Sequence, residues 1–521
     1  MNPVRFFFSL TRLGGKALWR WKDLVALAVI GVCWVLARRV YSWDNGVPFD
    51  DTRLAWSMQF LDPAWLRETP WRSLWFLHSQ PPLFNAYLAA ILNLFPGQET
   101  RFFALSYRLL GVLLAVSLYG LQRAIGITRF WAVAVTVLVC CAPAALIYER
   151  YLFYTYPVAA LIAVAGVFAW RFVEKGWRVA DGLVLFTLLG ALIFTRSMFH
   201  PFLWLLPMAA GFCWMAGRGK WRRVALLAAI PMVASLALFT KNAFLFGEFT
   251  SSSWLGMSLG KYAVRNMSQD ELAAYLTRDD FPAIFAVETF EPVDDYRPYL
   301  PRPLAEPTGV PALDADRKAT GAANMNHLQF IAASNEFGRG AKIILLNDPG
   351  YFLRTFREAL IVYSKPATDY VLIALRERPV DPITRWYARI VYGKFGPSPF
   401  HYKEIDGWLE RQDKHRLEQI GWFLPIYLLL GIGVGVAVAL ALIRERRRPT
   451  GSEFLILFLA FNVLYVSGIG TLLEVGENNR FRYQIEPVLF VLVAAAIQRL
   501  AMARTLHRKS PPFWTRWRRR R

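Results

Sequence analysis

Two adjacent carboxylates, Asp50 and Asp51 in the stretch FDDTRLAW, are candidates for proton transfer because of their residue type and their spacing. They follow the first apolar run of the chain by a few residues and lie next to Arg53. A partly desolvated carboxylate at a membrane interface can act as a general base that takes a proton from an acceptor hydroxyl or amine. The alternative is that one of the two is the N-cap of a following helix. Paired acids do not decide between these roles, so other polar residues must.

His78 and Gln80, in HSQPPL, lie in the same interval between apolar runs. A lone histidine is more often structural than functional. Here it shares an interval with an acidic pair and precedes the rigid Pro81-Pro82 step, so it is a candidate for hydrogen bonding to a phosphate oxygen or a sugar.

Glu149 and Arg150, in IYERYLFY, stand at the end of an apolar run. A carboxylate between two apolar runs is costly unless it is paired. A catalytic role for Glu149 therefore has as its alternative an ion pair with Arg150 or another interfacial arginine. The two readings are compatible, because a pocket for a charged lipid head group needs such a network.

Further cations and a second histidine are candidates for binding a phosphate: Arg108, Arg196, His200, Arg480 and Arg482. Arg196 ends one apolar run and His200 begins the next, so we expect the short turn to project both into one patch. A guanidinium fork suits phosphate, which favours this role for the arginines at 480 and 482. The alternative is that these two pair with Glu474, Glu477 or Glu486. The arginine at 108 is expected to snorkel outward as a structural pair or a further phosphate contact.

Several motifs are absent from the sequence. It contains no Walker or dinucleotide-binding glycine loop and no HExxH, which disfavours nucleotide-driven chemistry and favours a lipid-linked donor. The acids are not spaced as a metal cluster, so a divalent metal is compatible with the sequence but not required. The four cysteines lie in apolar runs, which predicts neither a disulfide framework nor a zinc site.

Hydropathy indicates the elements that must position these residues. With 55% hydrophobic residues and apolar blocks of membrane-spanning length, the 521-residue chain is predicted to be an all-α polytopic membrane protein. We expect ten transmembrane helices: 24–42, 102–122, 131–148, 153–172, 181–196, 201–217, 224–243, 419–443, 453–472 and 485–503.

Lysine and arginine runs between these helices predict the topology. The basic stretches are 5–22, 123–129, 171–178, 218–223, 444–448 and the tail 504–521. If all are cytoplasmic, both termini are cytoplasmic and every candidate residue faces outward. Topology and anionic membrane lipids then account for the net charge of +22, so nucleic acid is not expected as a partner.

These boundaries divide the chain into an amino-terminal membrane module (1–243), an extracytoplasmic segment (244–418), carboxy-terminal helices (419–503) and a basic tail (504–521). We name 43–101 the first loop segment and 244–418 the second loop segment. In the first, the spacing of Leu54, Met58, Leu61 and Trp65 predicts a surface helix, and 81–97 a juxtamembrane helix. In the second, Ser268 and Glu271 form a predicted capping box, and the proline-rich stretch 292–311 predicts no regular helix.

The order of these pieces resembles the GT-C superfamily of integral-membrane glycosyltransferases, especially the branch of the aminoarabinose transferase and the protein O-mannosyltransferases. PFDDTRLAW is similar to the acidic motif of that family's first outward loop, which implies a catalytic position for Asp50. QPPLFNAY is similar to its KPPL-type motif. The further matching positions are Arg108, Glu149, Thr195 with Arg196, and Arg480. The resemblance implies transfer of a sugar from a polyprenyl phosphate on the outer face, usually with inversion.

Two positions depart from the family pattern, because Gln80 replaces the usual lysine and Glu149 replaces aspartate. The resemblance covers 20–245 in register and 419–503 by general pattern, whereas 244–418 matches no family segment. The expected function is transfer of a glycosyl unit from a polyprenyl-phosphate donor to a glycolipid, lipopolysaccharide, polysaccharide or protein. The expected location is the bacterial inner membrane. The alternatives are a flippase for lipid-linked sugars, a ligase that uses a polyprenyl diphosphate, and a non-enzymatic assembly subunit.

Overall fold

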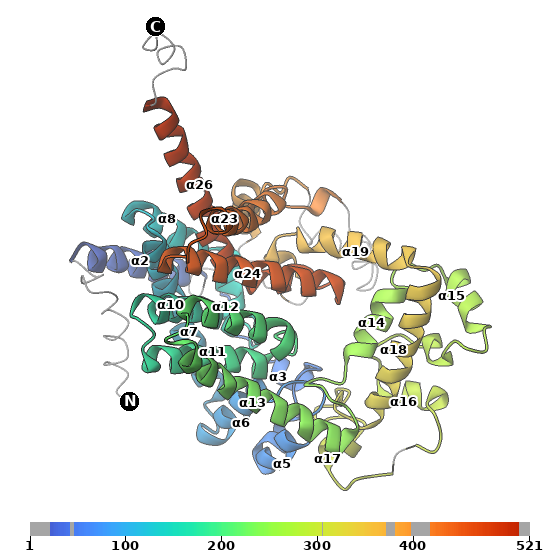
Figure 1. Ribbon diagram of the computed structural model, residues 1–521. Helices are drawn as coiled ribbons and strands as arrows, with labels where there is room; N and C mark the ends of the chain where they lie inside the picture. Colours follow the sequence, from blue (N-terminus) through green and yellow to red (C-terminus); the bar gives the residue numbers. More distant parts are fainter. Residues whose placement is uncertain are drawn as a thin grey trace.

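A bundle of long apolar helices carries a smaller helical group at one end (Figure 1). The computed structural model describes residues 21–41, 46–304, 306–370, 373, 381–396 and 417–509. Within these ranges the chain is helical with isolated β-bridges and no strands. The predicted all-α class is therefore confirmed for the described residues. The basic amino terminus before residue 21 and the tail after residue 509 lie outside them.

In the described part of the chain, five helices are long and apolar enough to cross a membrane: α7 (Glu99–Ile125), α10 (Thr155–Glu174), α13 (Trp221–Phe246), α23 (Phe423–Glu445) and α24 (Gly451–Leu472). A sixth crossing is α8 (Arg129–Cys140) with α9 (Pro143–Glu149), if this pair, bent by 55°, forms one span. These six agree in position with six of the ten predicted helices. The chain is a polytopic α-helical membrane protein by this criterion.

The other four predicted spans are helical without passing the same test of length and apolarity. They correspond to α2 (Trp21–Arg39), α11 (Val179–Thr195), η2 (Pro201–Leu205) with α12 (Leu206–Ala216), and α26 (Glu486–Lys509). α26 continues six residues past the predicted end of its span, into the predicted tail. The total of ten spans stays a prediction.

α10 is the centre of the bundle. It packs against α7, α11 and α24. Within an apolar stretch of 18 residues, 83% of α10 is buried, compared with 28% of α23. A helix that is apolar on all sides is expected in such an interior position. The outer helices present leucine, isoleucine and valine side chains outward, which is the composition that lipid tails accept.

The basic loops gather at one end of the bundle, which we name the basic-loop end. Arg129 at the start of α8 pairs with Asp23 of α2 at 2.8 Å, and Arg171 pairs with Asp181 across the α10–α11 turn at 2.8 Å. Two further hydrogen bonds tie neighbouring loops together there, from Lys220 to Gly176 and from Gln498 to Gly126.

The opposite end, which we name the Asp50 end, carries both loop segments. The first loop segment contains α3 (Arg53–Trp56), α4 (Pro63–Glu68), α5 (Pro70–Trp75) and α6 (Leu83–Leu94). The predicted continuous surface helix is wrong: Asp62 caps α4 by accepting from the Ala64 N–H, and Pro63 and Pro70 restart the helix. α6 confirms a short helix after the prolines.

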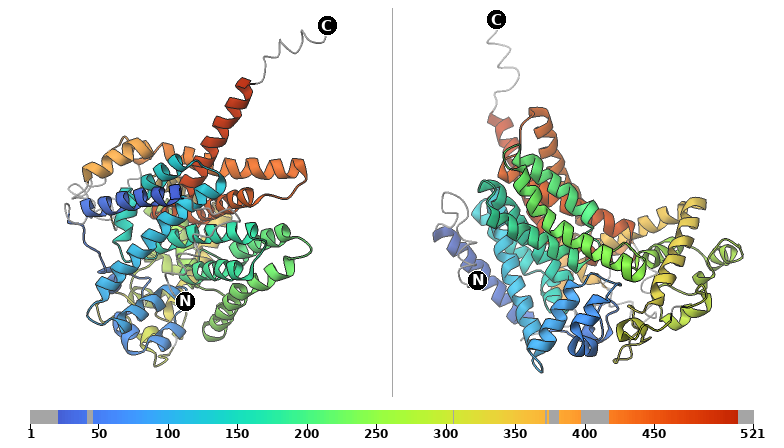
Figure 2. Two further views of the ribbon diagram at one scale, coloured as in Figure 1. Left: turned by 90° about the vertical axis from the view of Figure 1, so that its left-hand side faces the viewer. Right: turned by 60° about the horizontal axis from the view of Figure 1, so that its bottom comes forward.

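The second loop segment gathers beside the bundle, as the right-hand view of Figure 2 shows. Its main helices are α14 (Leu255–Val264), α15 (Gln269–Leu276), α18 (Gln329–Asn347) and α19 (Gly350–Tyr363). Short turns complete it: η3 (Ala283–Ala286), α16 (Val293–Tyr296), η4 (Arg297–Tyr299), α17 (Pro311–Asp314), η5 (Ala367–Asp369), α21 (Asp381–Tyr387), η7 (Ala388–Tyr392) and η9 (Leu417–Gln419). The predicted capping box is present at the start of α15, and 292–311 contains single turns only. α14 packs on α18, forming a small core separate from that of the bundle.

Candidate functional site

Asp50 is fixed by a short parallel bridge to Tyr151. Its backbone N–H donates to the Arg150 carbonyl at 2.7 Å, and its carbonyl accepts from the Leu152 N–H at 2.9 Å. The carboxylate accepts from the backbone and the hydroxyl of Thr52, which makes a turn just before α3. The side chain is buried, 5% exposed. The bridge therefore joins the first loop segment to the aromatic-rich stretch between α9 and α10.

The two adjacent acids have different neighbours. The Thr100 hydroxyl, near the start of α7, donates to the carboxylate of Asp51. Asp50, in contrast, acts electrostatically on Tyr151, whose pKa burial raises to about 12. Arg53, Arg480 and Glu477 act on the same phenol. Tyr151 is thus within electrostatic range of both the acid of the first loop segment and the late arginine.

Arg196 and Arg480 meet at one tyrosine. The guanidinium of Arg196 lies 5.2 Å from the ring centre of Tyr154, and that of Arg480 lies 5.7 Å from it. Arg196, at the end of α11, also stacks on Phe481 at 3.7 Å, and Arg480 lies 4.7 Å from Phe153. Both arginines are buried, 5% and 1% exposed. Residues nearly 300 positions apart therefore form one cationic cluster among aromatic rings.

The cluster holds a carboxylate and donors without acceptors. Glu477 pairs with Arg480 and accepts from the Tyr370 hydroxyl at 2.8 Å. Nη1 of Arg196 and Nε of Arg480 are buried and have no hydrogen-bond partner in the described part of the chain. Buried donors of this kind are rare in native proteins, and they are suited to an anionic ligand.

Arg482, in contrast, has a structural environment. It is fully buried in α25 (Asn478–Tyr483), donates to the Lys365 carbonyl at 2.7 Å and pairs with Glu486 at 3.0 Å. It also donates to the Tyr363 carbonyl. These bonds satisfy carbonyls at the end of α19, which a helix leaves without internal partners. Pairing with Glu486 was the predicted alternative to phosphate binding.

Glu149 is the partner of Arg38 from α2. The two pair through two nitrogens of the guanidinium, with Nε 2.8 Å from Oε1, and the Tyr156 hydroxyl donates to Oε2 at 2.9 Å. Arg150 instead donates to the Val47 carbonyl at 2.6 Å. Glu149 therefore forms an ion pair, which was the alternative to a catalytic role. Its partner is Arg38 and not the adjacent Arg150.

His78 joins the two loop segments. Its Nε2 lies 3.0 Å from the Asn326 carbonyl, and its Nδ1 lies 2.8 Å from the Ser253 hydroxyl. Because a carbonyl only accepts, Nε2 carries the hydrogen and Nδ1 accepts from Ser253. Burial lowers the pKa of His78 to about 3, and Lys241 and His327 act in the same direction. Both ring nitrogens are thus engaged within the protein, and the ring is neutral.

The remaining predicted positions have other surroundings. Gln80 is half-buried just before the two prolines, and Arg108 is exposed on α7. His200 accepts from the Phe202 N–H at 3.3 Å at the start of η2 and packs on Phe239. Arg196 and His200 contact different aromatic rings, and their common patch stays a prediction.

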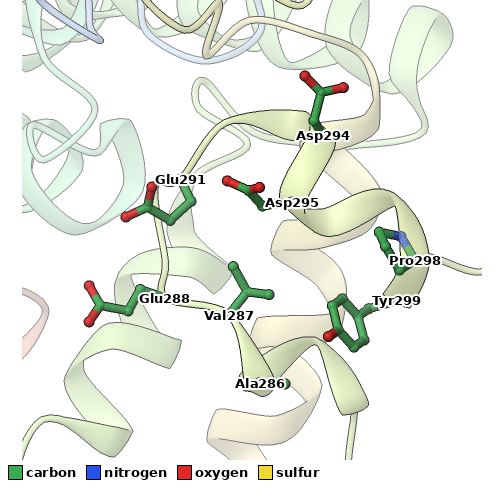
Figure 3. A pocket seen from close by; sticks show the side chains of 8 residues that line it. All are labelled: Ala286, Val287, Glu288, Glu291, Asp294, Asp295, Pro298 and Tyr299. Atoms are coloured by element: carbon green, nitrogen blue, oxygen red, sulfur yellow. The ribbon is translucent and has the colours of Figure 1, made fainter.

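An acidic pocket lies apart from the cluster, in the second loop segment (Figure 3). Glu288, Glu291, Asp294 and Asp295 line it together with Tyr299. Burial and the adjacent acids raise the pKa of Glu291. Across the residues that the structure describes, no group of three histidine, cysteine or acidic side chains is arranged to hold a metal ion.

Sequence reasoning missed several members of the site. Phe153, Tyr154 and Tyr370 form the walls around the arginines, and Arg38 was not considered as a partner of Glu149. The density of aromatic residues in IYERYLFYTYP was the available signal for the first two. Tyr370 and Arg38 carry no local signal, because their roles depend on contacts across more than 100 residues.

Gly111 in α7 should be essential to the buried ion pair. An added Cβ there would lie 2.5 Å from Oε2 of Glu149, whereas one at Gly120 of the same helix meets nothing within 4 Å. We expect Gly111→Ala to destabilise the protein by about 1–3 kcal/mol. Gly120→Ala should be neutral or stabilise by about 0.5–1 kcal/mol, because alanine is the better helix former. Thermal unfolding of both variants in detergent measures this, and equal midpoints would contradict it.

His78 should make stability depend on mildly acidic pH. Its folded-state pKa of about 3 lies below the ordinary value of 6.5, so its contribution is complete above pH 6.5 and is lost as the pH falls toward 3. The slope from this ring is at most about 1.4 kcal/mol per pH unit. We expect the unfolding midpoint of the wild type to fall more steeply than that of His78→Asn between pH 6.5 and 4.5. Parallel curves would show that the ring does not titrate as described.

Comparisons of this chain with protein-family models, with curated proteins and with solved structures each returned no match. A functional assignment therefore rests on the residues themselves and on how the fold arranges them.

Proposed function

We propose that this protein is a membrane glycosyltransferase that moves a sugar from a polyprenyl phosphate to an extracytoplasmic acceptor. The acceptor class is a glycolipid, lipopolysaccharide, polysaccharide or protein. The resemblance of PFDDTRLAW and QPPLFNAY to GT-C motifs supports this proposal. The architecture of a polytopic membrane protein with both loop segments at one end of its bundle is compatible with it.

One observation carries the proposal. The stretch 150–154 is bridged to Asp50 at its start and contacts Arg196 and Arg480 at its end. An acid and two buried guanidinium groups are thereby held by a single short segment. Transfer of a sugar from a phosphate needs two kinds of group: a base that deprotonates the acceptor, and positive charge that stabilises the leaving phosphate.

The proposed reaction uses Asp50 as the general base. It takes the proton of an acceptor hydroxyl or amine as that atom attacks the anomeric carbon. The new glycosidic bond forms while the bond from carbon to phosphate oxygen breaks on the opposite face, so the configuration inverts. Arg196 and Arg480 stabilise the charge that develops on the departing polyprenyl phosphate. Such preorganised charge acts strongly in a water-poor site.

The proposed setting is the bacterial plasma membrane, crossed ten times, with both termini in the cytoplasm. Gathering of the basic loops at one end of the bundle supports this orientation, because the positive-inside rule then places that end inside. The Asp50 end then opens outward, where polyprenyl-linked sugars and envelope acceptors meet.

A ligase that transfers a whole glycan from a polyprenyl diphosphate is the second candidate. The orphan donors of Arg196 and Arg480 favour it as much as they favour the first, because a diphosphate needs more positive charge. It differs in depending less on Asp50. Mass spectrometry of envelope glycolipids and glycans, with and without the protein, identifies the transferred unit and the acceptor. An unchanged set of glycans would contradict both candidates.

Asp50→Asn should abolish transfer while leaving membrane insertion intact. The amide keeps the shape and can still accept from Thr52, but it cannot take a proton. We expect a rate lower by about 10²–10⁴. The matched control is Asp294→Asn, which changes an acid of the separate pocket and should retain full activity. The measurement is restoration of the missing glycan in cells lacking the protein. Full activity of Asp50→Asn would refute the role of base.

Arg196→Gln should slow transfer by about 10²–10³, the loss expected when one group that stabilises a developing anion is removed. The control is Arg339→Gln, at an exposed arginine of α18 paired with Glu336. Both are assayed for transfer at saturating donor in membranes that contain equal amounts of protein. Equal rates for the two variants would exclude Arg196 from the reaction.

A further inference from the structure

The stretch 75–79 of the first loop segment is held through five consecutive carbonyls, three bonded by the second loop segment and two by Lys241 of α13. The carbonyl of each residue in 75–79 accepts a hydrogen bond from a residue between 241 and 326. Lys241 donates to residues 75 and 77 at 2.8 and 3.2 Å, and Ser253 and Ser252 donate to residues 78 and 79 at 3.0 and 2.6 Å. Asn326 donates to residue 76 at 3.2 Å. Loops seldom have every carbonyl satisfied by distant residues, because most loop carbonyls face water.

Asn326 is the centre of this arrangement. Its Oδ1 accepts from the backbone N–H groups of His78 and Ser79, both at 3.0 Å. Its Nδ2 donates to Phe76 and to Ala312, both at 3.2 Å, and its own carbonyl accepts from the imidazole of His78. The side chain is buried, so each of these bonds is protected from water.

Residues 318–320, a few positions before Asn326, bind the first loop segment at a second place, between residues 55 and 62. Lys318 Nζ donates to the Ser57 carbonyl at 2.7 Å, and the Thr320 hydroxyl donates to the Ala55 carbonyl at 3.0 Å. The Ala319 N–H donates to the carboxylate of Asp62. Residues 55 and 57 lie at the end of α3, which begins directly after the turn of Asp50. Burial lowers the pKa of Lys318 to about 8, an effect that Asp62 opposes.

We infer that the turn 316–328 is a positioning element that holds Asp50 and Gln80 in place through Lys318 and Asn326. One arm of the first loop segment leads from the acid to residue 57, and the other leads from residue 75 to the Gln80-Pro81-Pro82 step. The turn bonds to both arms, so it sets their separation. This inference rests on the proposed function for its catalytic meaning, whereas the tie itself is independent of any activity.

The bonds to both arms do more than pack the two loop segments together, because they can fix the position of Asp50. Within the first loop segment, α3 and α5 are helices of four and six residues that cannot hold a fixed geometry alone, since short helices are marginal in water. A general base must be positioned to within a fraction of an ångström. The second loop segment supplies the rigidity, because α18 continues from this turn into the core of α14 and α18.

Hydrogen exchange of the purified full-length protein tests the tie. In Asn326→Ala, we expect faster exchange in 53–62 and 75–82 and unchanged exchange in α10. Lys318→Met is the milder variant, because it retains the buried stem and loses one bond, and it should loosen 53–62 alone. The matched control is Asn335→Ala, whose side chain bonds to Glu248 in the same segment and away from the first loop segment. Unchanged exchange in both variants would overturn the tie, whatever the activity.

The pH dependence of glycan transfer tests positioning separately from folding. Loss of folded protein lowers the rate without moving the pH profile, whereas displacement of Asp50 changes its surroundings and moves the acid limb. We expect Asn326→Ala to lower the rate per folded molecule about tenfold and to move that limb. Faster exchange with an unmoved limb would leave a structural tie and overturn the positioning role. Faster exchange in Asn326→Ala together with full transfer by Asp50→Asn would show that the proposed function has failed.

Discussion

Burial of positive charge at one end of an apolar bundle is the constraint on which the rest of this structure depends. Removing a guanidinium from water costs several kcal/mol unless a partner compensates. Arg38 pairs with Glu149, and Arg482 pairs with Glu486. Arg196 has aromatic faces, which attract a cation less strongly than a carboxylate does. An anionic ligand is what this arginine is suited to bind.

The aromatic stretch between α9 and α10 connects the helix bundle, Asp50 and the two arginines of the cluster. The Tyr107 hydroxyl of α7 donates to the Phe153 carbonyl at 2.7 Å, so the stretch is fixed to the bundle. Tyr151 bridges to Asp50, and the ring of Tyr154 contacts the guanidinium groups of Arg196 and Arg480. The first loop segment receives its remaining support from the turn 316–328. The acid is thus held by the membrane bundle and by the second loop segment together.

Local patterns predicted the candidate residues better than their partners. Arg196 and Arg480 were selected because each stands beside an apolar run and a guanidinium fork suits phosphate, and the structure brings these two together. Glu149, Arg482 and His78 were also selected on local grounds, but Glu149 pairs with Arg38, Arg482 pairs with Glu486, and His78 bonds to Asn326 and Ser253. The cost of burial is visible in a sequence, but a ligand and an internal partner offset it equally well.

The sequence by itself determined the α-helical membrane class, the separation of basic loops from the candidate site, and the short helix after Pro81-Pro82. These follow from hydropathy, charge and proline geometry, which act over windows of a few to about 20 residues. Only the tertiary structure decided that Arg38 pairs with Glu149, that Tyr154 contacts two arginines, and that Asn326 holds residues 76–79. The physical reason is that such partners meet across more than 100 residues, where distance in space is set by the packing of the whole bundle.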